Sequence, residues 1–356
     1  MPAKAECIIL QTGPTGIRNT PFFLVSGFSQ LKIEKLMEKI ILWIAGLLSA
    51  LSACSQSDLA TPERKTVLVS NTLYSEPANH SLPNSAPLLN PGKPVQSMPY
   101  ALVAGGSKGI GYAIAEALAR RGFNLILIAR HMDSLSSARI KLECAYHVHV
   151  EILSYDLSTN EAATEIAKWC EDRNIQLKML CNVAGFGGAR DYLSLSLDSL
   201  RYMINLNVGS AMALTLTLLP LLEKNAPSFI LNVGSMAGFA PIPVKNLYSA
   251  TKSAVVFFSY SLSYQLKEKN ISVSVLCPGP VFTKPEIKED TKKKLGKFGM
   301  LMAVPPEKVG EIAVRETFNK KMVIVPGTLS KIMAFIIRIL PRKMVVAIYG
   351  KAGDKK

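Results

Sequence analysis

Residues 99–111 read PYALVAGGSKGIG, which joins an apolar run to a cluster of glycines. The apolar part resembles a buried β-strand, residues 113–121 have a helical composition, and Gly122 ends that helix. A glycine cluster alone also occurs in ordinary loops. Here a second strand-like run, NLILIA at 124–129, follows the helix. The order predicts a βαβ unit whose tight turn brings backbone N–H groups to the pyrophosphate of a dinucleotide at a helix N-terminus.

Tyr248 and Lys252 form a second signal, because residues at i and i+4 share one face of a helix. A lysine beside a tyrosine favours the phenolate and so lowers the pKa of the phenol. The hydroxyl of Ser235, in the upstream segment Asn232–Ser235, could polarise a carbonyl group. An exposed helix face would give the same Tyr-x-x-x-Lys spacing by chance. The pair therefore indicates catalysis only together with the dinucleotide turn.

Several ordered motifs resemble the short-chain dehydrogenase/reductase family from about Met98 to the C-terminus. Gly105, Gly109 and Gly111 match its Thr-Gly-x-x-x-Gly-x-Gly turn, with Ala104 in the threonine position. Residues 182–185 match its Asn-Asn-Ala-Gly segment, with Val183 replacing the second asparagine.

Three further positions match. Asp156 corresponds to the acidic residue that meets the adenine ring, and Asn207 to the catalytic asparagine. The stretch from Cys277 to Thr283 corresponds to the Pro-Gly turn that closes over the nicotinamide.

The resemblance implies hydride transfer between a nicotinamide and a carbonyl or alcohol carbon. Tyr248 would donate the proton, Lys252 would lower its pKa and bind the nicotinamide ribose, and Ser235 would orient the carbonyl. Asn207 would support a water that connects Lys252 to solvent; a helix-bending polar residue is its alternative reading. The expected cofactor-binding residues are Gly105, Ser107, Lys108, Gly109, Ile110, Gly111, Arg130, Asp156, Leu157, Asn182, Ala184, Gly185, Tyr248, Lys252, Pro278, Gly279 and Thr283.

The cofactor is expected to be NADP(H). Relatives that prefer NAD place an acidic residue after the second strand, whereas this chain has Arg130 there and Lys108 in the glycine turn. Two cations near one ribose suit a 2′-phosphate.

The predicted fold is an α/β single doubly wound parallel-sheet Rossmann domain, residues 98–356, with helices on both faces. Further strand-like runs lie at 148–153, 179–183, 229–233, 273–276 and 323–325. His147 and His149 would then share one strand face. Because no carboxylate or cysteine motif completes a metal site, a structural role is favoured over metal binding. The cysteines show no Cys-x-x-Cys spacing, and those in this domain are expected to be reduced.

The N-terminal residues differ in character. Residues 37–54, ending in Leu51-Ser52-Ala53-Cys54, resemble a lipoprotein signal or membrane anchor. Met37 would be a natural start, which makes 1–36 an uncertain extension, and the Ser/Asn/Pro-rich residues 55–97 are expected to form a disordered linker. We expect a membrane-associated enzyme, with the cytoplasmic side favoured by the cofactor.

The formal net charge is +15, with lysines concentrated between 284 and 297. These lysines could be a solvated helix face or a funnel for an anionic substrate or membrane surface, and no nucleic-acid module accompanies them. Residues 284–306 are expected to cover the cleft, with Met300, Leu301 and Met302 lining it. The basic, amphipathic stretch 328–349 fits core packing, a partner interface or membrane contact.

The tail and the cleft resemble those of relatives that reduce 3-oxoacyl chains or oxidise hydroxysteroids, so a hydrophobic carbonyl or alcohol substrate is expected. In the family, the helix carrying Tyr248 pairs with its symmetry mate, which implies a homodimer or homotetramer. The alternative function is a non-catalytic NADPH-binding sensor or membrane-tethered scaffold on the same fold.

Overall fold

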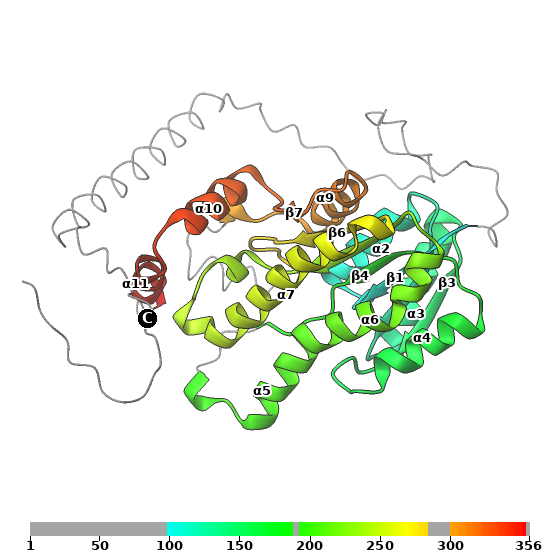
Figure 1. The fold of residues 1–356 in the computed structure, drawn as a ribbon, viewed down its shortest axis with the longest axis horizontal. Coiled ribbons are helices and arrows are strands. Elements are labelled where there is room, and N and C mark those ends of the chain that lie inside the picture. The colour runs from blue at the N-terminus through cyan, green and yellow to red at the C-terminus, as the bar shows by residue number, and fades with distance from the viewer. Residues whose placement is uncertain (1–97, 188–191, 284–299, 354–356) are drawn as a thin grey trace, which may run out of the picture. The chain divides into compact units, whose positions relative to one another are not determined.

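The computed structural model describes residues 98–187, 192–283 and 300–353 (Figure 1). The strands are β1 (Tyr100–Ala104), β2 (Asn124–Ala129), β3 (Val150–Ser154), β4 (Leu177–Asn182), β5 (Ser228–Val233), β6 (Ile271–Leu276) and β7 (Val323–Ile324). The longer helices are α2 (Gly109–Ala119), α3 (Met132–Tyr146), α4 (Ala162–Asp172), α5 (Leu197–Ile204), α6 (Ser210–Lys224), α7 (Asn246–Gln265), α9 (Pro306–Phe318), α10 (Thr328–Ile339) and α11 (Arg342–Gly353). Short helical segments are η2 (Tyr192–Ser194), η3 (Asn205–Gly209), η4 (Met236–Phe239), η5 (Pro243–Lys245) and η6 (Lys267–Lys269).

All seven strands run parallel in the order β3-β2-β1-β4-β5-β6-β7. The chain therefore winds outward from β1 in one direction and then from β4 in the other. This is the predicted doubly wound sheet, and the expectation is confirmed. The order reverses between β1 and β4, and a crevice outside the carboxyl ends of these two strands is where such sheets bind ligands.

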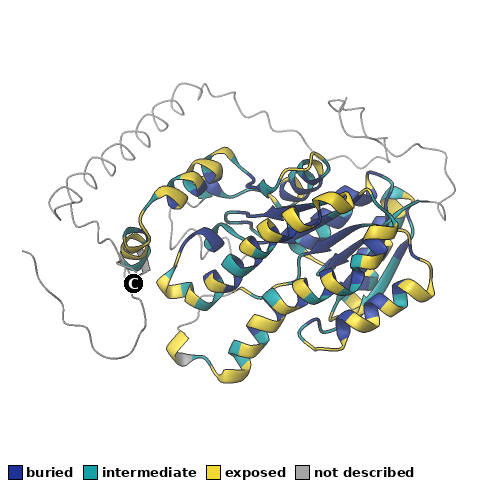
Figure 2. Ribbon diagram, in the orientation of Figure 1, coloured by how far each residue is buried: buried dark blue, intermediate teal, exposed yellow. Residues whose placement is uncertain are grey.

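The two faces of the sheet have separate cores because successive strand residues point in opposite directions. On one face, Ala101 and Val103 of β1 join a cluster with residues of α2, α3 and α9. On the other face, Leu102 and Ala104 join residues of α4, α6 and α7. Figure 2 shows the strands buried between the helical layers, while α10 and α11 are more exposed. The helices thus cover both faces of the sheet and leave the strand ends uncovered by these two layers.

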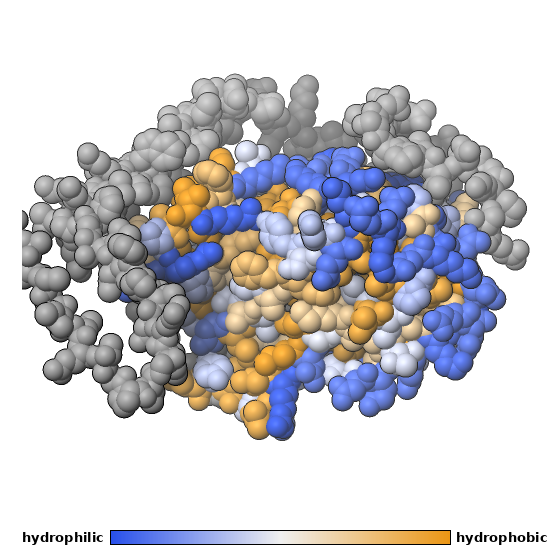
Figure 3. All heavy atoms as spheres, in the orientation of Figure 1, coloured by the Kyte–Doolittle hydropathy of each residue, from blue (hydrophilic) through white to orange (hydrophobic). Residues whose placement is uncertain are grey.

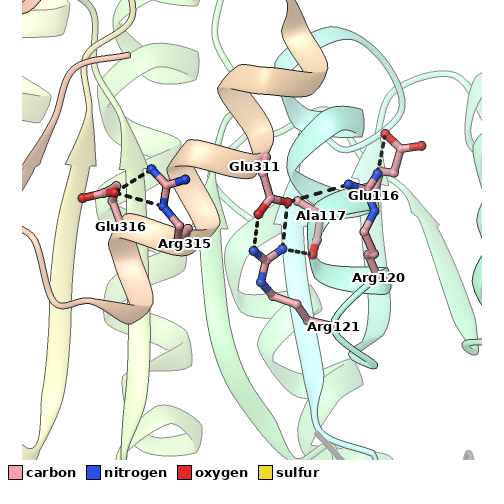
Figure 4. A network of polar contacts seen from close by, with 7 residues as sticks. All are labelled: Glu116, Ala117, Arg120, Arg121, Glu311, Arg315 and Glu316. Atoms are coloured by element: carbon pink, nitrogen blue, oxygen red, sulfur yellow. Dashed lines mark hydrogen bonds and ion pairs between the residues drawn. The ribbon is translucent and has the colours of Figure 1, made fainter. Parts of the chain in front are cut away.

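Helices α2 and α9 approach closely because α9 carries a glycine at the contact. A Cβ added at Gly310 would lie 2.3 Å from the backbone oxygen of Ala113. An ion-pair network then joins the same helices (Figure 4): the guanidinium of Arg121 binds the carboxylate of Glu311, with Nη1 3.0 Å from Oε2, and Nη1 also donates to the Ala117 oxygen at 2.7 Å. This packing fixes α2, and with it the glycine turn at its N-terminus.

The expectation that His147 and His149 share one face of a strand was wrong. His147 is not in a strand: it caps α3 in the left-handed conformation, with φ of 55°. His149 lies before β3, and its Nε2 lies 3.0 Å from Glu151 Oε1. Across the described ranges, no group of three or more His, Cys, Asp or Glu side chains could hold a metal ion. Cys144, Cys170, Cys181 and Cys277 are free thiols, as expected.

Among the residues that the structure describes, one helical stretch, Leu197–Lys224, is long and apolar enough to cross a membrane. It comprises α5, η3 and α6. Leu214, Leu218 and Leu222 on α6 are buried against the sheet, whereas Leu216 is 73% exposed. The predicted anchor (37–54), the linker (55–97) and the lysines at 284–297 lie outside the described residues.

Candidate active site

The glycine turn follows β1 and has a backbone that side chains would disturb. Gly105 and Gly109 have φ of 88° and 57°, in the region that favours glycine. A Cβ added at Gly111 would lie 2.0 Å from the Gly105 oxygen, so the helix can approach the turn only without a side chain there. Lys108 is the N-cap of α2, and its side chain makes no capping hydrogen bond. The first N–H groups of α2 are therefore donors that can meet an anion.

The segment after β6 returns to this turn. The Cγ2 of Thr283 would lie 3.0 Å from a Cβ added at Gly109, so Thr283 lies directly over the N-terminus of α2. Pro278 accepts a hydrogen bond from the Met236 N–H at 3.1 Å, which ties the Pro-Gly turn to the end of β5. The structure thus brings the glycine turn and the expected Pro-Gly segment to one place.

The end of β4 lies beside the glycine turn, where Ala104 accepts hydrogen bonds from the N–H groups of Val183 and Ala184 at 3.0 and 2.7 Å. The side chain of Asn182 points elsewhere. Its Nδ2 lies 2.8 Å from Asn232 Oδ1 and 3.1 Å from Thr215 Oγ1, in a buried network between β4, β5 and α6. The Nδ2 group of Asn182 therefore has structural partners, whereas its buried Oδ1 has no hydrogen-bond partner among the described residues. The assignment of Asn182 to the cofactor site stays a prediction.

Asn207 lies in η3, a π-helical turn between α5 and α6. π-Helical turns inside α-helices frequently mark functional sites. The Asn207 amide accepts from the Phe186 N–H at 2.6 Å and donates to the Phe186 oxygen at 2.9 Å and to Thr251 Oγ1 at 3.1 Å. The side chain therefore fixes the loop after β4 against the helix that carries Tyr248. The helix irregularity expected as one reading of Asn207 is present, and its catalytic role stays a prediction.

Lys252 projects from α7 into the buried interior, where its Nζ donates to the Val233 oxygen at 2.8 Å. A Cβ added at Gly185 would lie 3.3 Å from both Lys252 Nζ and Asn207 Oδ1. The glycine therefore leaves room beside an ammonium and an amide oxygen. Burial lowers the pKa of Lys252 to about 8, because the charged form loses hydration.

Tyr248 lies at the start of α7, next to the loop after β4, since a Cβ added at Gly187 would lie 3.2 Å from its ring. The ammonium of Lys252 lies 6.0 Å from the centre of that ring. Burial raises the pKa of Tyr248, and hydrogen bonding with Ser235 lowers it in part. The lowering of the Tyr248 pKa that was expected from Lys252 is not seen for the protein's own groups: burial is the largest effect and raises this pKa above its ordinary value, so the phenol is protonated at neutral pH.

Tyr202, which the sequence did not single out, lies beside Arg130 at the end of β2. Arg130 follows β2, and its Nη1 lies 2.7 Å from the hydroxyl of Tyr202 on α5. Asp156, after β3, accepts from the N–H and hydroxyl of Ser158 through one oxygen, at 3.0 and 2.7 Å. Leu157 is buried in the core, so its side chain is not available to a ligand. In the sequence, nothing except its position five residues before Asn207 pointed to Tyr202.

These residues fit a dinucleotide. The uncapped N-terminus of α2 suits a pyrophosphate, Arg130 presents an exposed guanidinium after β2, and Lys252 contacts the end of β5 through the Val233 oxygen. The family comparison agrees: the short chain dehydrogenase model matches residues 99–294, more than half of the chain. The chain belongs to the short-chain dehydrogenase family.

Two curated relatives illustrate where this short-chain dehydrogenase lies within the family. It is 34% identical over 189 residues to very-long-chain 3-oxoacyl-CoA reductase-A of Danio rerio, covering 52% of this chain and 59% of the relative. It is 35% identical over 187 residues to hydroxysteroid dehydrogenase-like protein 1 of Gallus gallus, covering 52% and 56%. The chain therefore spans less than two thirds of the length of these relatives.

Solved structures share the fold. A 7beta-hydroxysteroid dehydrogenase structure superposes with a TM-score of 0.65 at 19% identity, covering 71% of this chain and 96% of that one. A Pseudomonas aeruginosa RhlG/NADP active-site complex gives a TM-score of 0.56 at 26% identity, covering 64% and 94%.

Proposed function

We propose that this short-chain dehydrogenase is an NADP(H)-dependent oxidoreductase that interconverts a carbonyl group and a secondary alcohol on a hydrophobic substrate. The observation that carries the proposal is the convergence of four side chains beside the glycine turn. The hydroxyl of Ser235 lies close enough to Tyr248 to lower its pKa, and Asn207 and Lys252 flank the space left by Gly185.

The bound nicotinamide supplies or accepts the hydride at the reacting carbon. The protein supplies the proton and the groups that position the reacting oxygen. In reduction, the phenol of Tyr248 donates its proton to the oxygen of the carbonyl group as negative charge develops there. The hydroxyl of Ser235 orients the same oxygen. Because burial raises the pKa of Tyr248, the proton is in place at neutral pH.

Lys252 and Asn207 support that transfer. Lys252 Nζ uses one N–H on Val233, so its remaining donors can meet ribose hydroxyls. Asn207 anchors the loop that borders this space, and we assign it a positioning role for a water beside Lys252. With a pKa of about 8, Lys252 is charged at neutral pH and can stabilise the phenolate that remains after proton donation.

The preference for NADP(H) rests on Arg130 and Lys108. Both are exposed, and neither makes an ion pair with an acidic side chain among the described residues. A guanidinium can hold a phosphate with two parallel hydrogen bonds. The NADP in the 26%-identical RhlG complex supports the same choice.

The hydrophobic substrate is supported by the relatives' names. Of the residues expected to line the cleft, Met302 is buried and Leu301 is 71% exposed, and their role in the cleft stays a prediction. A 3-oxoacyl, steroid-like or aliphatic ketone is the proposed class.

Single-turnover oxidation of NADPH with a panel of 3-oxoacyl and aliphatic ketones tests the activity. Tyr248→Phe keeps the ring and removes the proton, so the rate should fall by at least about a hundredfold. Tyr264→Phe, on the same helix but 83% exposed, is the matched control and should leave the rate unchanged. Tight NADPH binding without oxidation by any ketone would instead favour the sensor or scaffold.

We also propose that residues 37–54 attach the enzyme to a membrane, with the catalytic domain on the cytoplasmic side. The apolar segment ahead of Cys54 supports this. A lipoprotein signal cleaved before Cys54 would instead carry the catalytic domain across the membrane; in that case Cys54→Ala should leave an uncleaved precursor, as seen by intact-mass analysis in the native host. A wild-type chain that begins upstream of Cys54 would refute processing at that residue.

A further inference from the structure

Helix α10 presents an apolar row to solvent. Its inward residues Ser330, Ala334 and Ile337 are buried, and Ala334 and Ile337 belong to a core cluster with residues of β6 and α7. Its outward residues Ile332, Phe335 and Ile339 are 38%, 65% and 64% exposed. They follow i, i+3, i+7 spacing and so lie on one face. Figure 3 shows hydrophobic side chains gathered over this part of the molecule, next to hydrophilic ones. We call Ile332, Phe335 and Ile339, with Lys331 and Arg338 beside them, the α10 surface.

The charges around this row have one sign. Residues 328–353 contain five basic residues and no acidic one. The guanidinium of Arg338 stacks 4.0 Å from the ring centre of Phe239, and Arg342 Nη1 donates to the Phe239 oxygen at 2.7 Å. Neither arginine forms an ion pair with a carboxylate in the part of the chain that the structure describes. Their positive charge is therefore held at the edge of an apolar face without being neutralised.

The first turn of α10 contacts the active site. A Cβ added at Gly279 would lie 2.9 Å from Ser330 Oγ, and one added at Gly327 would lie 3.1 Å from Val304. Ser330 Oγ also lies 3.5 Å from the Met302 oxygen. The helix therefore begins against the Pro-Gly turn and against the segment that borders the proposed substrate cleft.

We infer that the α10 surface docks onto an anionic lipid bilayer, with α10 lying in the interface. An apolar row edged by lysine and arginine matches this environment, because the row enters the acyl boundary while the cations meet lipid phosphates. A second copy of the chain is a poorer occupant. Two-fold pairing of this face would desolvate cations against cations, since residues 328–353 offer no carboxylate to meet them.

This surface is independent of residues 37–54, because it belongs to the catalytic domain itself. Its contact with the Gly279 turn would place the cleft border next to the bilayer. Entry of a hydrophobic substrate from lipid rests on the proposed function; the docking itself does not.

The test uses the full chain with a tryptophan reporter in the α10 surface. Trp43 and Trp169 are replaced by phenylalanine, and Phe335→Trp is compared with Ile140→Trp, which lies on α3 and is similarly exposed at 61%. Vesicles contain brominated phosphatidylcholine with or without phosphatidylserine. The fluorescence of Phe335→Trp should shift to the blue and be quenched on vesicles with phosphatidylserine, while Ile140→Trp should change little. Bromine quenches at contact, so attachment through the N-terminal residues alone would not produce this difference.

Substitutions then separate the apolar and charged contributions. In the reporter protein, Ile339→Ser should lower the vesicle affinity of the Phe335→Trp site on the order of tenfold. Lys331→Gln should lower it about fivefold on phosphatidylserine vesicles, with little change on neutral ones. Circular dichroism checks that both variants fold. Equal quenching of the two reporters, or no quenching of either, would overturn the inference. Shielding of Phe335→Trp by raised protein concentration without lipid would also overturn it, in favour of a second copy. NADPH oxidation in detergent tests the proposed function separately.

Discussion

Reversing the charge of Arg130 is the sharpest test of how the cofactor is chosen. The residue stands one position beyond β2, and its Nη1 is held 2.7 Å from the Tyr202 hydroxyl. Its ring contact with Tyr202, at 5.8 Å from the guanidinium carbon to the ring centre, restricts the side chain further. The guanidinium has five N–H donors, so those that do not face Tyr202 can still grip a 2′-phosphate. Arg130→Asp removes that grip and adds a negative charge.

The magnitude follows from the kind of interaction that the substitution removes. A hydrogen bond to a charged group contributes about 1.5–3 kcal/mol. Because Arg130 is exposed and solvent screens it, the lower half of that range applies, about 2 kcal/mol. The dissociation constant of NADPH should therefore rise about thirtyfold. NADH has a hydroxyl in place of the phosphate, so its affinity should stay within about threefold or improve.

Titration of intrinsic fluorescence with NADPH and NADH measures both constants on the same protein. Lys141→Asp, on the exposed face of α3, makes the same change in net charge and controls for the overall field. Tyr202→Phe removes only the hydroxyl that holds Arg130 and should weaken NADPH binding by a smaller factor, with NADH unaffected. Equal losses for both cofactors in Arg130→Asp would refute the reasoning, as would tighter binding of NADH than NADPH by the wild type.

Three further predictions concern stability and ionisation, each measured by urea unfolding. The pKa of Lys252 falls from 10.5 to about 8 on folding, so the charged lysine lowers the free energy of unfolding below pH 8, and this effect disappears as the pH rises past 10.5. The free energy of unfolding of Lys252→Met, relative to that of the wild type, should therefore fall by about 3 kcal/mol between these limits. A difference that does not vary with pH would contradict the burial argument. Gly310→Ala should destabilise the fold by about 1–3 kcal/mol, because the added Cβ would lie 2.3 Å from the Ala113 oxygen. Gly209→Ala is the control: a Cβ there meets nothing within 4 Å, so the change should be neutral or slightly stabilising. Equal effects of the two substitutions would refute the close approach of α2 and α9. Arg121 lowers the pKa of Glu311, so the ion pair stabilises the fold fully above the ordinary glutamate pKa, and this stabilisation is lost as the pH falls through the pKa of Glu311 in the folded state. Glu311→Gln should thus be less stable than the wild type at neutral pH and equally stable in acid. A difference in stability that persists in acid would count against the ion pair.

The parts of the fold that follow from local pattern were predictable. The expected strand at 124–129 has the observed bounds of β2, and the strand–glycine–helix order at 99–121 gave the correct turn. Glycine positions in such a turn are dictated by backbone geometry, which the sequence shows directly. Other strands shifted by one or two residues, since strand ends depend on the partner strand: β6 begins at Ile271 beside Ser228 of β5.

The features that failed depend on contacts between distant residues. His147 lies in an apolar-polar alternation that resembles a strand, yet the end of α3 extends to it and places it in a left-handed cap. The sequence also did not show that Asn182 Nδ2 bonds Asn232 and Thr215, because these partners come from other elements. Tyr202 acquires significance only because α5 lies over the end of β2. None of these partners is adjacent in sequence.

The protonation state of Tyr248 also depends on the folded surroundings rather than on the local sequence, and it affects which direction of the reaction is favoured. Four residues along a helix bring a phenol and an ammonium together, and the pair alone suggests phenolate and ammonium. In the folded protein the two groups share a desolvated space, with the ammonium 6.0 Å from the centre of the ring. Desolvation acts on each group separately: it raises the pKa of Tyr248 and lowers that of Lys252 to about 8. At neutral pH the free site therefore holds a protonated phenol beside a single positive charge. That state already contains the proton that carbonyl reduction consumes. Alcohol oxidation needs the phenol to lose its proton first, so it should gain more from a rise in pH than reduction does.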